Sequence, residues 1–332
     1  MSFTVSFVER RDPETSSIER LIRSVGNGLS DLGINVRYDK IRYGNSAAGI
    51  FANLFARKPK PADIFHVTGH INYFALLLPA ERTVLTIHDI RILGMRSGLR
   101  RYLIKKFFFD FPTRRLNYIV TGTEDAKRDL IRITNCPPEK IHVIGHPMTI
   151  DPSKHERKFD RENPRILQIG TAPNKNLFRL IAALIGIKCV LIIIGRLDEP
   201  TVRALCESEI TFENRFDLSD EQIRDEYANS DIVAFCSTSE GFGLPIIEAQ
   251  AIGIPVITSS VDPMMDVAGA GAVLADPFDP ESIRKSVQRV IQDEEFRTAA
   301  VENGRRNVDR FTPDRIARKY LDLYRKILDK LS

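Results

Sequence analysis

The stretch DIVAFCSTSEGFGLPIIE, residues 231–248, decides the fold of the C-terminal half of the chain. Its first five residues are mostly apolar and predict a buried strand, and two glycines follow before a second apolar run. Glycine lets a backbone approach a ligand closely, and the amides at the start of the next helix make an anion site. Glu240 and Glu248 flank this turn, where carboxylates would repel a phosphate but suit hydroxyl groups. The alternative, a capped helix with two exposed glutamates, needs none of this glycine and proline placement.

The rest of the chain alternates short β-branched runs with amphipathic stretches, as is typical of βα units around a parallel sheet. One expected helix begins with Ser16 and Glu19 in capping-box spacing and ends at Gly33, and another spans Pro313–Leu331. The expected strands are residues 3–8, 35–38, 64–68, 83–87, 118–120, 141–144, 165–169, 189–194, 210–216, 231–235, 255–258 and 272–274.

A chain of 332 residues fits two domains rather than one core. The polar segment from Asp151 to Pro164 is closed by prolines and predicts a linker between two α/β halves. We therefore expect an N-terminal domain over 1–155, a C-terminal domain over 156–312, and a final helix over 313–332 that packs back on the N-terminal domain. Two such halves place a ligand cleft at the carboxyl ends of their strands.

Composition excludes several classes of protein. With 43% hydrophobic and 28% charged residues, the chain is neither disordered nor fibrous. Its longest apolar runs fall short of the ~18–20 residues of a membrane span, and Arg10 and Arg11 interrupt any signal-peptide pattern. The four cysteines show no C-x-x-C spacing, and neither a D-x-D pair nor a His/Cys cluster occurs. We expect no disulfide framework, no essential metal and no cofactor.

Charge is distributed unevenly along the chain. Residues 1–160 carry 26 Lys and Arg against 17 Asp and Glu, a net charge of +9, whereas residues 161–332 carry 22 against 27, a net of −5. This asymmetry suggests that the first half faces an anionic surface or ligand, although drift in surface composition gives the same pattern.

The segment 96–115, RSGLRRYLIKKFFFDFPTRR, is both basic and aromatic. It predicts either an interfacial helix on anionic lipid or a buried helix with a solvated basic rim. Nucleic acid is not favoured as a partner, because no recognised nucleic-acid motif accompanies the segment.

The stretch 231–260 resembles the donor-binding motif of the retaining glycosyltransferases of family 4. That family has the GT-B fold, an α/β architecture of two Rossmann-like parallel-sheet domains facing each other across a cleft. The likeness continues through 261–283 and 311–324 and covers nearly the whole chain. Other landmarks resemble the second phosphate loop (170–177), the cleft strand of the acceptor domain (86–89) and the end of that domain (118–123 and 140–144).

The resemblance implies a role for each matching residue. Glu248 would accept hydrogen bonds from the donor ribose and Glu240 from the transferred sugar, while Lys175 would neutralise the leaving diphosphate. His88 would line the cleft near the sugar and the attacking hydroxyl. The implied catalytic residues are Lys175, Glu240 and His88, and the implied donor-binding residues are Gly170, Thr171, Lys175, Glu240, Gly241, Phe242, Gly243, Leu244 and Glu248.

Read without the family, two of these residues have simpler explanations. Lys175 follows a strand, a glycine and a proline, where a cation meets phosphate readily, but a solvated surface lysine fits the same position. A histidine at a strand end, such as His88, is more often structural than catalytic. The other histidines near the predicted strands, His66, His70 and His146, are expected to be packing or loop residues.

Three positions depart from the family pattern. Asn174 stands where an arginine is frequent, Cys236 where proline is usual, and RRDPETSSIE replaces a Gly-Gly pair in the first loop. The first loop and Asn174 would weaken phosphate binding or shift it to Arg10, Arg11 or the amides near Ser16 and Ser17.

The function implied is a retaining, metal-independent transfer of a sugar from a nucleotide-diphosphate sugar to an acceptor hydroxyl. The expected setting is bacterial cell-surface polysaccharide or glycolipid biosynthesis, with a saccharide or lipid-linked acceptor and base contacts near Phe216–Leu218. The expected location is the cytoplasm. If segment 96–115 binds anionic lipid, the protein is instead peripheral on the inner face of the cell membrane. The alternatives are a non-catalytic GT-B nucleotide-sugar-binding or scaffold protein and a sugar-nucleotide epimerase of the same fold.

Overall fold

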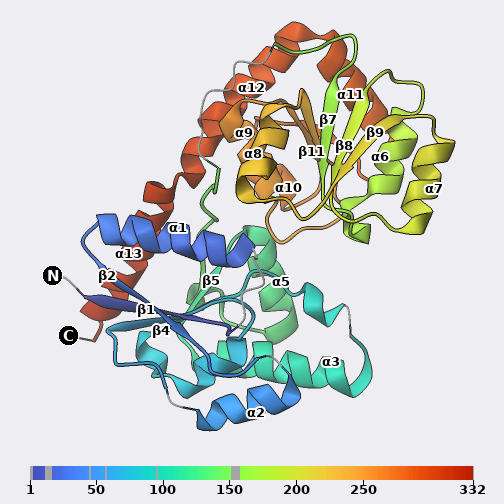
Figure 1. Cartoon of the computed structure of the whole chain (residues 1–332). Coiled ribbons are helices and arrows are strands. Elements are labelled where there is room, and N and C mark those ends of the chain that lie inside the picture. Colours follow the sequence, from blue (N-terminus) through green and yellow to red (C-terminus); the bar gives the residue numbers. More distant parts are fainter. Residues whose placement is uncertain are drawn as a thin grey trace. The chain divides into compact units, whose positions relative to one another are not determined.

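The structure, a computed structural model, describes residues 3–11, 17–44, 46–56, 58–94, 96–150 and 158–331. The expected cap Ser16 and residues 151–157 of the expected linker lie outside the described residues. The chain divides into two compact units (Figure 1). Unit 1 comprises Met1–Thr149 together with Thr312–Ser332, and unit 2 comprises Ile150–Phe311.

Unit 1 is built on a parallel sheet whose inner strands are buried, whereas its edge strands are partly exposed. Buried apolar runs such as Ile64–Val67 are typical of parallel strands covered on both faces. The strand order is β2-β1-β3-β4-β5-β6. The strands are β1 (Thr4–Glu9), β2 (Asn35–Lys40), β3 (Ile64–Val67), β4 (Thr83–Thr86), β5 (Tyr118–Thr121) and β6 (Ile141–Val143).

Helices cover both faces of this sheet. On one face α1 (Ser17–Asp31) packs against the C-terminal helix α13 (Pro313–Asp329), which contributes Ile316, Tyr320 and Tyr324 to the core. A Cβ at Gly28 would lie 2.7 Å from the Cβ of Ala317, so this glycine allows the two helices to pack closely. The other face carries α2 (Ala47–Phe55), η1 (Asn72–Leu77), α3 (Gly98–Ile104), the π-helical turn η4 (Lys105–Asp110), α4 (Phe111–Arg115) and α5 (Glu124–Thr134). Short turns are η2 (Ala80–Arg82), η3 (Arg91–Leu93) and η5 (Pro138–Lys140).

Unit 2 contains a second parallel sheet, with strand order β12-β11-β10-β7-β8-β9. The strands are β7 (Arg165–Ile169), β8 (Val190–Ile194), β9 (Thr211–Arg215), β10 (Ile232–Phe235), β11 (Val256–Ser259) and β12 (Val273–Ala275). The chain runs outward from β7 in one direction and from β10 in the other, so the order reverses between these two strands. Ligands of open α/β sheets bind at such a point, beyond the carboxyl ends of the strands.

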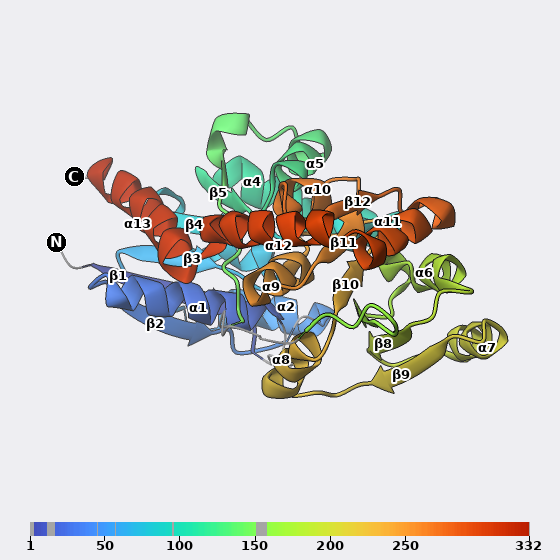
Figure 2. The ribbon, with the colours of Figure 1, turned by 90° about the horizontal axis from the view of Figure 1, so that it is seen from above.

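Two layers of helices enclose the unit 2 sheet (Figures 1 and 2). One layer contains α6 (Leu177–Leu184), α7 (Glu199–Glu207) and α11 (Pro280–Gln292), whose apolar side chains share a core with β7 and β8. The other contains α8 (Asp220–Ala228), α9 (Leu244–Ile252), α10 (Met264–Ala268) and α12 (Glu294–Val308). The turns η6 (Pro173–Lys175) and η7 (Asp309–Phe311) complete the unit. All the expected strands are present within two residues of their expected limits.

Candidate active site

Most of the predicted donor-site residues lie on two loops that follow neighbouring strands of unit 2, and Leu244 and Glu248 lie on α9 after the second loop. One loop, 170–176, follows β7, and the other, 236–243, follows β10. Because β7 and β10 pair in parallel, their carboxyl ends bring the loops together. The loops are also bonded directly, since the amide of Thr238 donates to the carbonyl oxygen of Asn174 at 2.8 Å. The candidate site is therefore at the switch point of the sheet.

The two loops join Lys175 to Glu240. Lys175 Nζ lies 2.6 Å from Glu240 Oε1, and the two side chains are 20% and 8% exposed. The ammonium group also lies 4.6 Å from the centroid of the Phe235 ring, within reach of a cation–π interaction. Lys175 is thus held in a partly buried ion pair, and the reading of it as a solvated surface lysine is wrong.

The first loop is shaped around the stem of Lys175. Gly170 has a φ of +89°, and a Cβ there would lie 2.9 Å from Lys175 Cε, so a side chain at 170 would displace the lysine. Gln168 Nε2 donates to the carbonyl oxygens of Gly170 at 3.1 Å and Lys175 at 3.2 Å. Thr171 Oγ1 donates to the carbonyl oxygen of Arg196 at 2.8 Å. Gly170 and Thr171 therefore set the shape of the loop.

Asn174, the residue that stands where the family frequently has an arginine, forms hydrogen bonds between the two loops. Its Nδ2 donates to the carbonyl oxygen of Ser239 at 2.9 Å and to Glu240 Oε1 at 3.2 Å. Glu240 Oε1 thus accepts from both Lys175 and Asn174. A neutral amide at this position orients the carboxylate and leaves Lys175 as its charged partner.

Asn176 is a structural residue of the site that sequence reasoning missed. It adopts a left-handed conformation with φ of +62°, is buried, and its Nδ2 donates to the carbonyl oxygens of Cys236 at 2.9 Å and Pro277 at 2.6 Å. Asparagine tolerates this conformation better than most residues, so an asparagine between a proline-containing turn and a helix was an available signal.

Glu248 is held by a second residue that sequence reasoning missed. It lies on α9, is 9% exposed, and its Oε2 accepts a hydrogen bond of 2.8 Å from the hydroxyl of Tyr227 on α8. Tyr227 is fully buried, so its ring fixes the position of the glutamate. Nothing in the sequence distinguishes this tyrosine from an ordinary core residue.

The start of α9 offers amides to an anion. Gly243 caps the helix with a φ of +106°, and a Cβ there would lie 3.0 Å from Ile246 Cδ1. Pro245 has no N–H group, and the amide of Ile246 already donates to the carbonyl oxygen of Gly243 at 3.0 Å. The N–H groups of Gly243 and Leu244 therefore lie at this helix start, where a phosphate can accept from them. The ring of Phe242 is buried and packs edge-to-face on Phe311, with ring centroids 5.6 Å apart.

His88 belongs to unit 1, where it follows β4 and lies among other histidines. Its Nδ1 is 3.3 Å from His146 Nε2, and its ring centroid is 6.0 Å from that of His70. Burial, together with the neighbouring histidines, lowers the pKa of His88 well below 6.5, and its Nε2 is buried without a hydrogen-bond partner among the described residues. A neutral imidazole with an unused nitrogen can bind a hydroxyl group. His70 and His146 were expected to be packing or loop residues, and the structure places both beside His88.

The fourth histidine of this region is structural. His66 Nδ1 lies 2.6 Å from the Tyr324 hydroxyl of α13, and its Nε2 lies 2.7 Å from Thr86 Oγ1. Burial lowers the pKa of His66 to about 3, so it is neutral and ties the C-terminal helix to the sheet.

The structure also describes the region expected to contact the nucleotide base and part of the first loop. Phe216, near the expected base contacts, is 49% exposed, and the guanidinium of Arg196 lies 4.7 Å from its ring centroid while pairing with Asp217. In the first loop Arg10 Nε donates to Glu19 Oε1 at 2.8 Å, and residues 12–16 lie outside the described residues.

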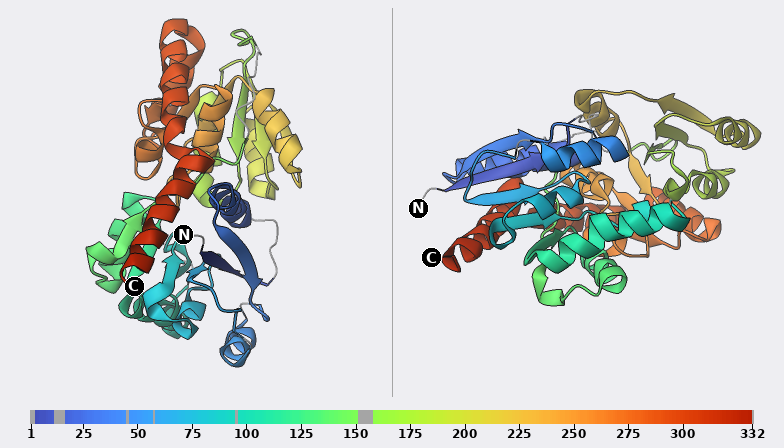
Figure 3. Two further views of the ribbon diagram at one scale, coloured as in Figure 1. Left: turned by 90° about the vertical axis from the view of Figure 1, so that its left-hand side faces the viewer. Right: turned by 90° about the horizontal axis from the view of Figure 1, so that it is seen from below.

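Within the segment 96–115, residues 98–115 form one continuous helical stretch, α3–η4–α4 (Figure 3). Phe109 is buried, so one side of the stretch faces the core. The outer side carries exposed apolar side chains as well as basic ones. Lys105 and Lys106 both bind Asp110, at 2.7 and 2.9 Å. Five large apolar side chains on it are at least 40% exposed, namely Leu99, Tyr102, Leu103, Phe107 and Phe111.

Two features are absent from the part of the chain that the structure describes. No group of three or more His, Cys, Asp or Glu side chains in that part is arranged to hold a metal ion. None of the helices in the described ranges is long and apolar enough to cross a bilayer.

The sequence is similar to those of known glycosyltransferases. The family described as Glycosyl transferases group 1 matches residues 150–307, the range that contains both site loops. The O-antigen chain mannosyltransferase RfbU of Salmonella typhimurium is 25% identical over 63% of this chain, and the match spans 60% of the relative's own length. The O-antigen chain mannosyltransferase B of Escherichia coli is also 25% identical, over 74% of this chain and 70% of that protein.

Solved structures resemble the chain over nearly its whole length. Sucrose-phosphate synthase from Thermosynechococcus elongatus superimposes with a TM-score of 0.75 at 15% identity, covering 98% of this chain and 99% of that one. Anabaena HepE in complex with UDP-glucose gives 0.73 at 14% identity, covering 98% and 100%. The expected GT-B fold is confirmed, and the family match and relatives support a GT-B glycosyltransferase.

Proposed function

We propose that this protein is a retaining, metal-independent glycosyltransferase that moves a sugar from a nucleotide-diphosphate sugar to an acceptor hydroxyl. The observation that carries the proposal is the Lys175–Glu240 pair of 2.6 Å at the carboxyl ends of β7 and β10. There a cation for the diphosphate lies beside a carboxylate for the sugar hydroxyls, and the amides of Gly243 and Leu244 open the next helix.

The proposed reaction depends on charge that develops as the donor bond stretches. The bond between the anomeric carbon and the phosphate oxygen breaks, and the acceptor oxygen bonds to that carbon on the same face. The acceptor proton passes to the departing phosphate. Lys175 and the amides of Gly243 and Leu244 stabilise the growing negative charge on the phosphate, which is electrostatic catalysis by groups already in place. Glu240 holds the sugar, and Glu248, fixed by Tyr227, holds the ribose.

We assign the donor and acceptor only by class. UDP-glucose in the HepE structure supports a uridine diphosphate sugar, and the two mannosyltransferase relatives support polysaccharide biosynthesis as the setting. Guanosine diphosphate sugars belong to the same proposal. The acceptor is a saccharide or a lipid-linked saccharide, and His88 is the candidate to bind its hydroxyl through Nε2.

The exposed apolar side chains of α3–η4–α4 support a peripheral membrane position as part of this proposal. Leu99, Phe107 and Phe111 would enter the interfacial region of a bilayer, and Arg100 and Arg101 would meet anionic headgroups. The proposed location is the cytoplasmic face of the cell membrane, where anionic lipids and nucleotide sugars are both available.

Release of nucleoside diphosphate from a panel of UDP and GDP sugars, in buffer containing a metal chelator, tests this function. The proposal predicts release that increases when acceptor is added. A non-catalytic binder would show thermal stabilisation by the donor but no release, and an epimerase would interconvert donor sugars without acceptor. Release that strictly requires a divalent metal would contradict the metal-free mechanism.

A further inference from the structure

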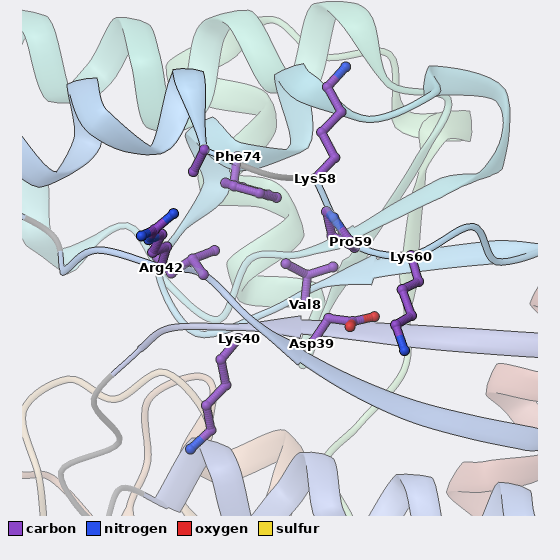
Figure 4. A pocket seen from close by; sticks show the side chains of 10 residues that line it. Val8, Asp39, Lys40, Arg42, Lys58, Pro59, Lys60 and Phe74 are labelled. Atoms are coloured by element: carbon purple, nitrogen blue, oxygen red, sulfur yellow. The ribbon is translucent and has the colours of Figure 1, made fainter.

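Unit 1 contains a cavity of about 230 Å³ that is separate from every residue assigned above (Figure 4). It lies beside the carboxyl ends of β1 and β2 and the segment that joins α2 to β3. Val8, Ile41 and Phe74 give it an apolar interior, and Figure 4 shows the Phe74 ring facing Val8 across it. Four basic residues also line it, namely Lys40, Arg42, Lys58 and Lys60, and Figure 4 shows the ammonium ends of the three lysines pointing outward from Val8 and Phe74.

The cavity carries a net positive charge that its own residues do not neutralise. Asp39 is the carboxylate in its lining, and it already accepts a hydrogen bond of 2.6 Å from Ser6 Oγ and pairs with Arg37 Nε at 2.8 Å. Nearby Glu9 pairs with Arg23 at 2.8 Å. Within the described ranges, none of the four basic side chains of the cavity forms an ion pair.

Hydrogen bonds hold both backbone segments that carry these cations. Asn53, which is 1% exposed, accepts from the amide of Tyr43 at 3.0 Å and donates to its carbonyl oxygen at 2.9 Å, so it fixes the segment that follows β2. Arg37 donates to the carbonyl oxygen of Lys60 at 2.6 Å. Pro59 and Pro61 alternate with the lysines and restrict φ in that segment. The backbone is therefore in place before any ligand arrives.

Size and chemistry together select the ligand class. Pockets for drug-sized ligands hold about 300–1,000 Å³, so this cavity suits a smaller group than a nucleotide sugar. Lysine and arginine form strong charge-assisted hydrogen bonds with phosphate, whereas the apolar interior suits the carbon skeleton attached to it.

We propose that this cavity binds a phosphate ester, with Phe74 against its organic part and the phosphate at the basic rim, where the flexible side chains of Lys58 and Lys60 turn toward it. The site goes beyond the donor site of the proposed function, because its residues all belong to unit 1. A phospholipid headgroup and a soluble phosphorylated metabolite present the same chemistry to it.

The test compares two charge-matched double variants of the full chain. Lys58→Gln with Lys60→Gln removes two cations from the cavity, and Lys188→Gln with Lys330→Gln removes two exposed cations elsewhere. Binding of glycerol 3-phosphate is measured by calorimetry, and binding of phosphatidylcholine vesicles with and without phosphatidic acid by co-sedimentation. We expect the cavity variant to lose at least about tenfold in affinity for at least one phosphate probe and the control variant to keep it.

Each outcome decides the proposal. Binding of glycerol 3-phosphate that the cavity variant loses supports a soluble ester, and binding only of phosphatidic acid vesicles with the same loss supports a lipid headgroup. Binding of neither probe, or equal binding by the two double variants, overturns the proposal. Arg42→Gln is a second variant should the double variant fail to fold. Donor binding is measured in the same samples, so failure here is distinguishable from failure of the proposed function.

Discussion

Lys175 Nζ lies 2.6 Å from Glu240 Oε1, so the cation expected to meet the leaving phosphate is paired with the carboxylate expected to hold the sugar. An arriving diphosphate must compete with Glu240 for this ammonium group, because both anions are attracted to it. As negative charge moves onto the departing phosphate, the balance shifts toward the phosphate. The pair thus holds Lys175 in place in the free protein, and the proposed mechanism requires the lysine to leave Glu240 for the phosphate during the reaction.

Lys175→Ala should lower kcat by about 10²–10³-fold, since preorganised donors toward a developing anion have effects of this size. The measurement is steady-state release of nucleoside diphosphate at saturating donor. Lys188→Ala, which removes an exposed lysine of the same unit, should leave kcat unchanged. Equal rates for wild type and Lys175→Ala would show that the lysine only stabilises the loop.

Glu240→Gln keeps the shape of the side chain but removes its charge. Free nucleoside diphosphate should bind at least as tightly as in the wild type, because Lys175 loses its competing partner. The free energy of transition-state binding should fall by about 1–3 kcal/mol, since a charged acceptor for the sugar hydroxyls is lost. Calorimetry of the diphosphate beside kcat/KM for the donor separates these effects. A parallel loss of both quantities would indicate a structural role.

Glu248→Ala should weaken donor binding by about 1–3 kcal/mol, the effect of removing a hydrogen-bonded charge. Tyr227→Phe should weaken it less, because the ring still packs but its 2.8 Å bond to Glu248 is lost. Both are measured by calorimetry, with Tyr102→Phe on an exposed tyrosine as control. Wild-type affinity in Glu248→Ala would remove this residue from the donor site.

The strands and the two loops were predictable because their signals are local. Buried parallel strands are short apolar runs, and the glycines at 170 and 243 mark positions that a side chain would block. The Lys175–Glu240 pair was not predictable, since its members are 65 residues apart and meet only because β7 and β10 are neighbours in the sheet. Strand order depends on packing over the whole unit, which no local pattern records. Tyr227 was missed for a related reason, because its hydroxyl gains meaning only from the helix packed against it.

The stability of the protein should fall as the pH drops below about 6.5. Burial lowers the pKa of His146 from 6.5 to about 4 and that of His66 to about 3, so only the unfolded chain takes up their protons over this range. Each group then reduces the free energy of unfolding by about 1.4 kcal/mol per pH unit until its folded pKa is reached. Urea unfolding at pH 7, 6 and 5 measures this slope, which His146→Gln should decrease. An unchanged slope in that variant would contradict the burial of a neutral His146.

The α3–η4–α4 surface should bind anionic vesicles and not neutral ones. Arg100→Ser with Arg101→Ser should weaken co-sedimentation by about 1 kcal/mol for each residue, and Leu99→Ser with Phe107→Ser should weaken it through lost apolar insertion. Phe178→Ser changes an exposed phenylalanine of unit 2 and serves as control. Binding should also decrease with salt, because exposed charges are screened over about 8 Å at physiological ionic strength. Equal binding to neutral vesicles would return this stretch to a structural role.

The most direct test of the donor site is a calorimetric titration of UDP and GDP into the wild type and Lys175→Ala. The account predicts that at least one of the two nucleotides binds the wild type in a 1:1 complex. It further predicts that Lys175→Ala weakens this binding by about tenfold or more, the scale of one charge-assisted hydrogen bond to phosphate. Failure of both nucleotides to bind the wild type, or equal affinity in the two proteins, would contradict the assignment of the β7 and β10 loops as the nucleotide-sugar site.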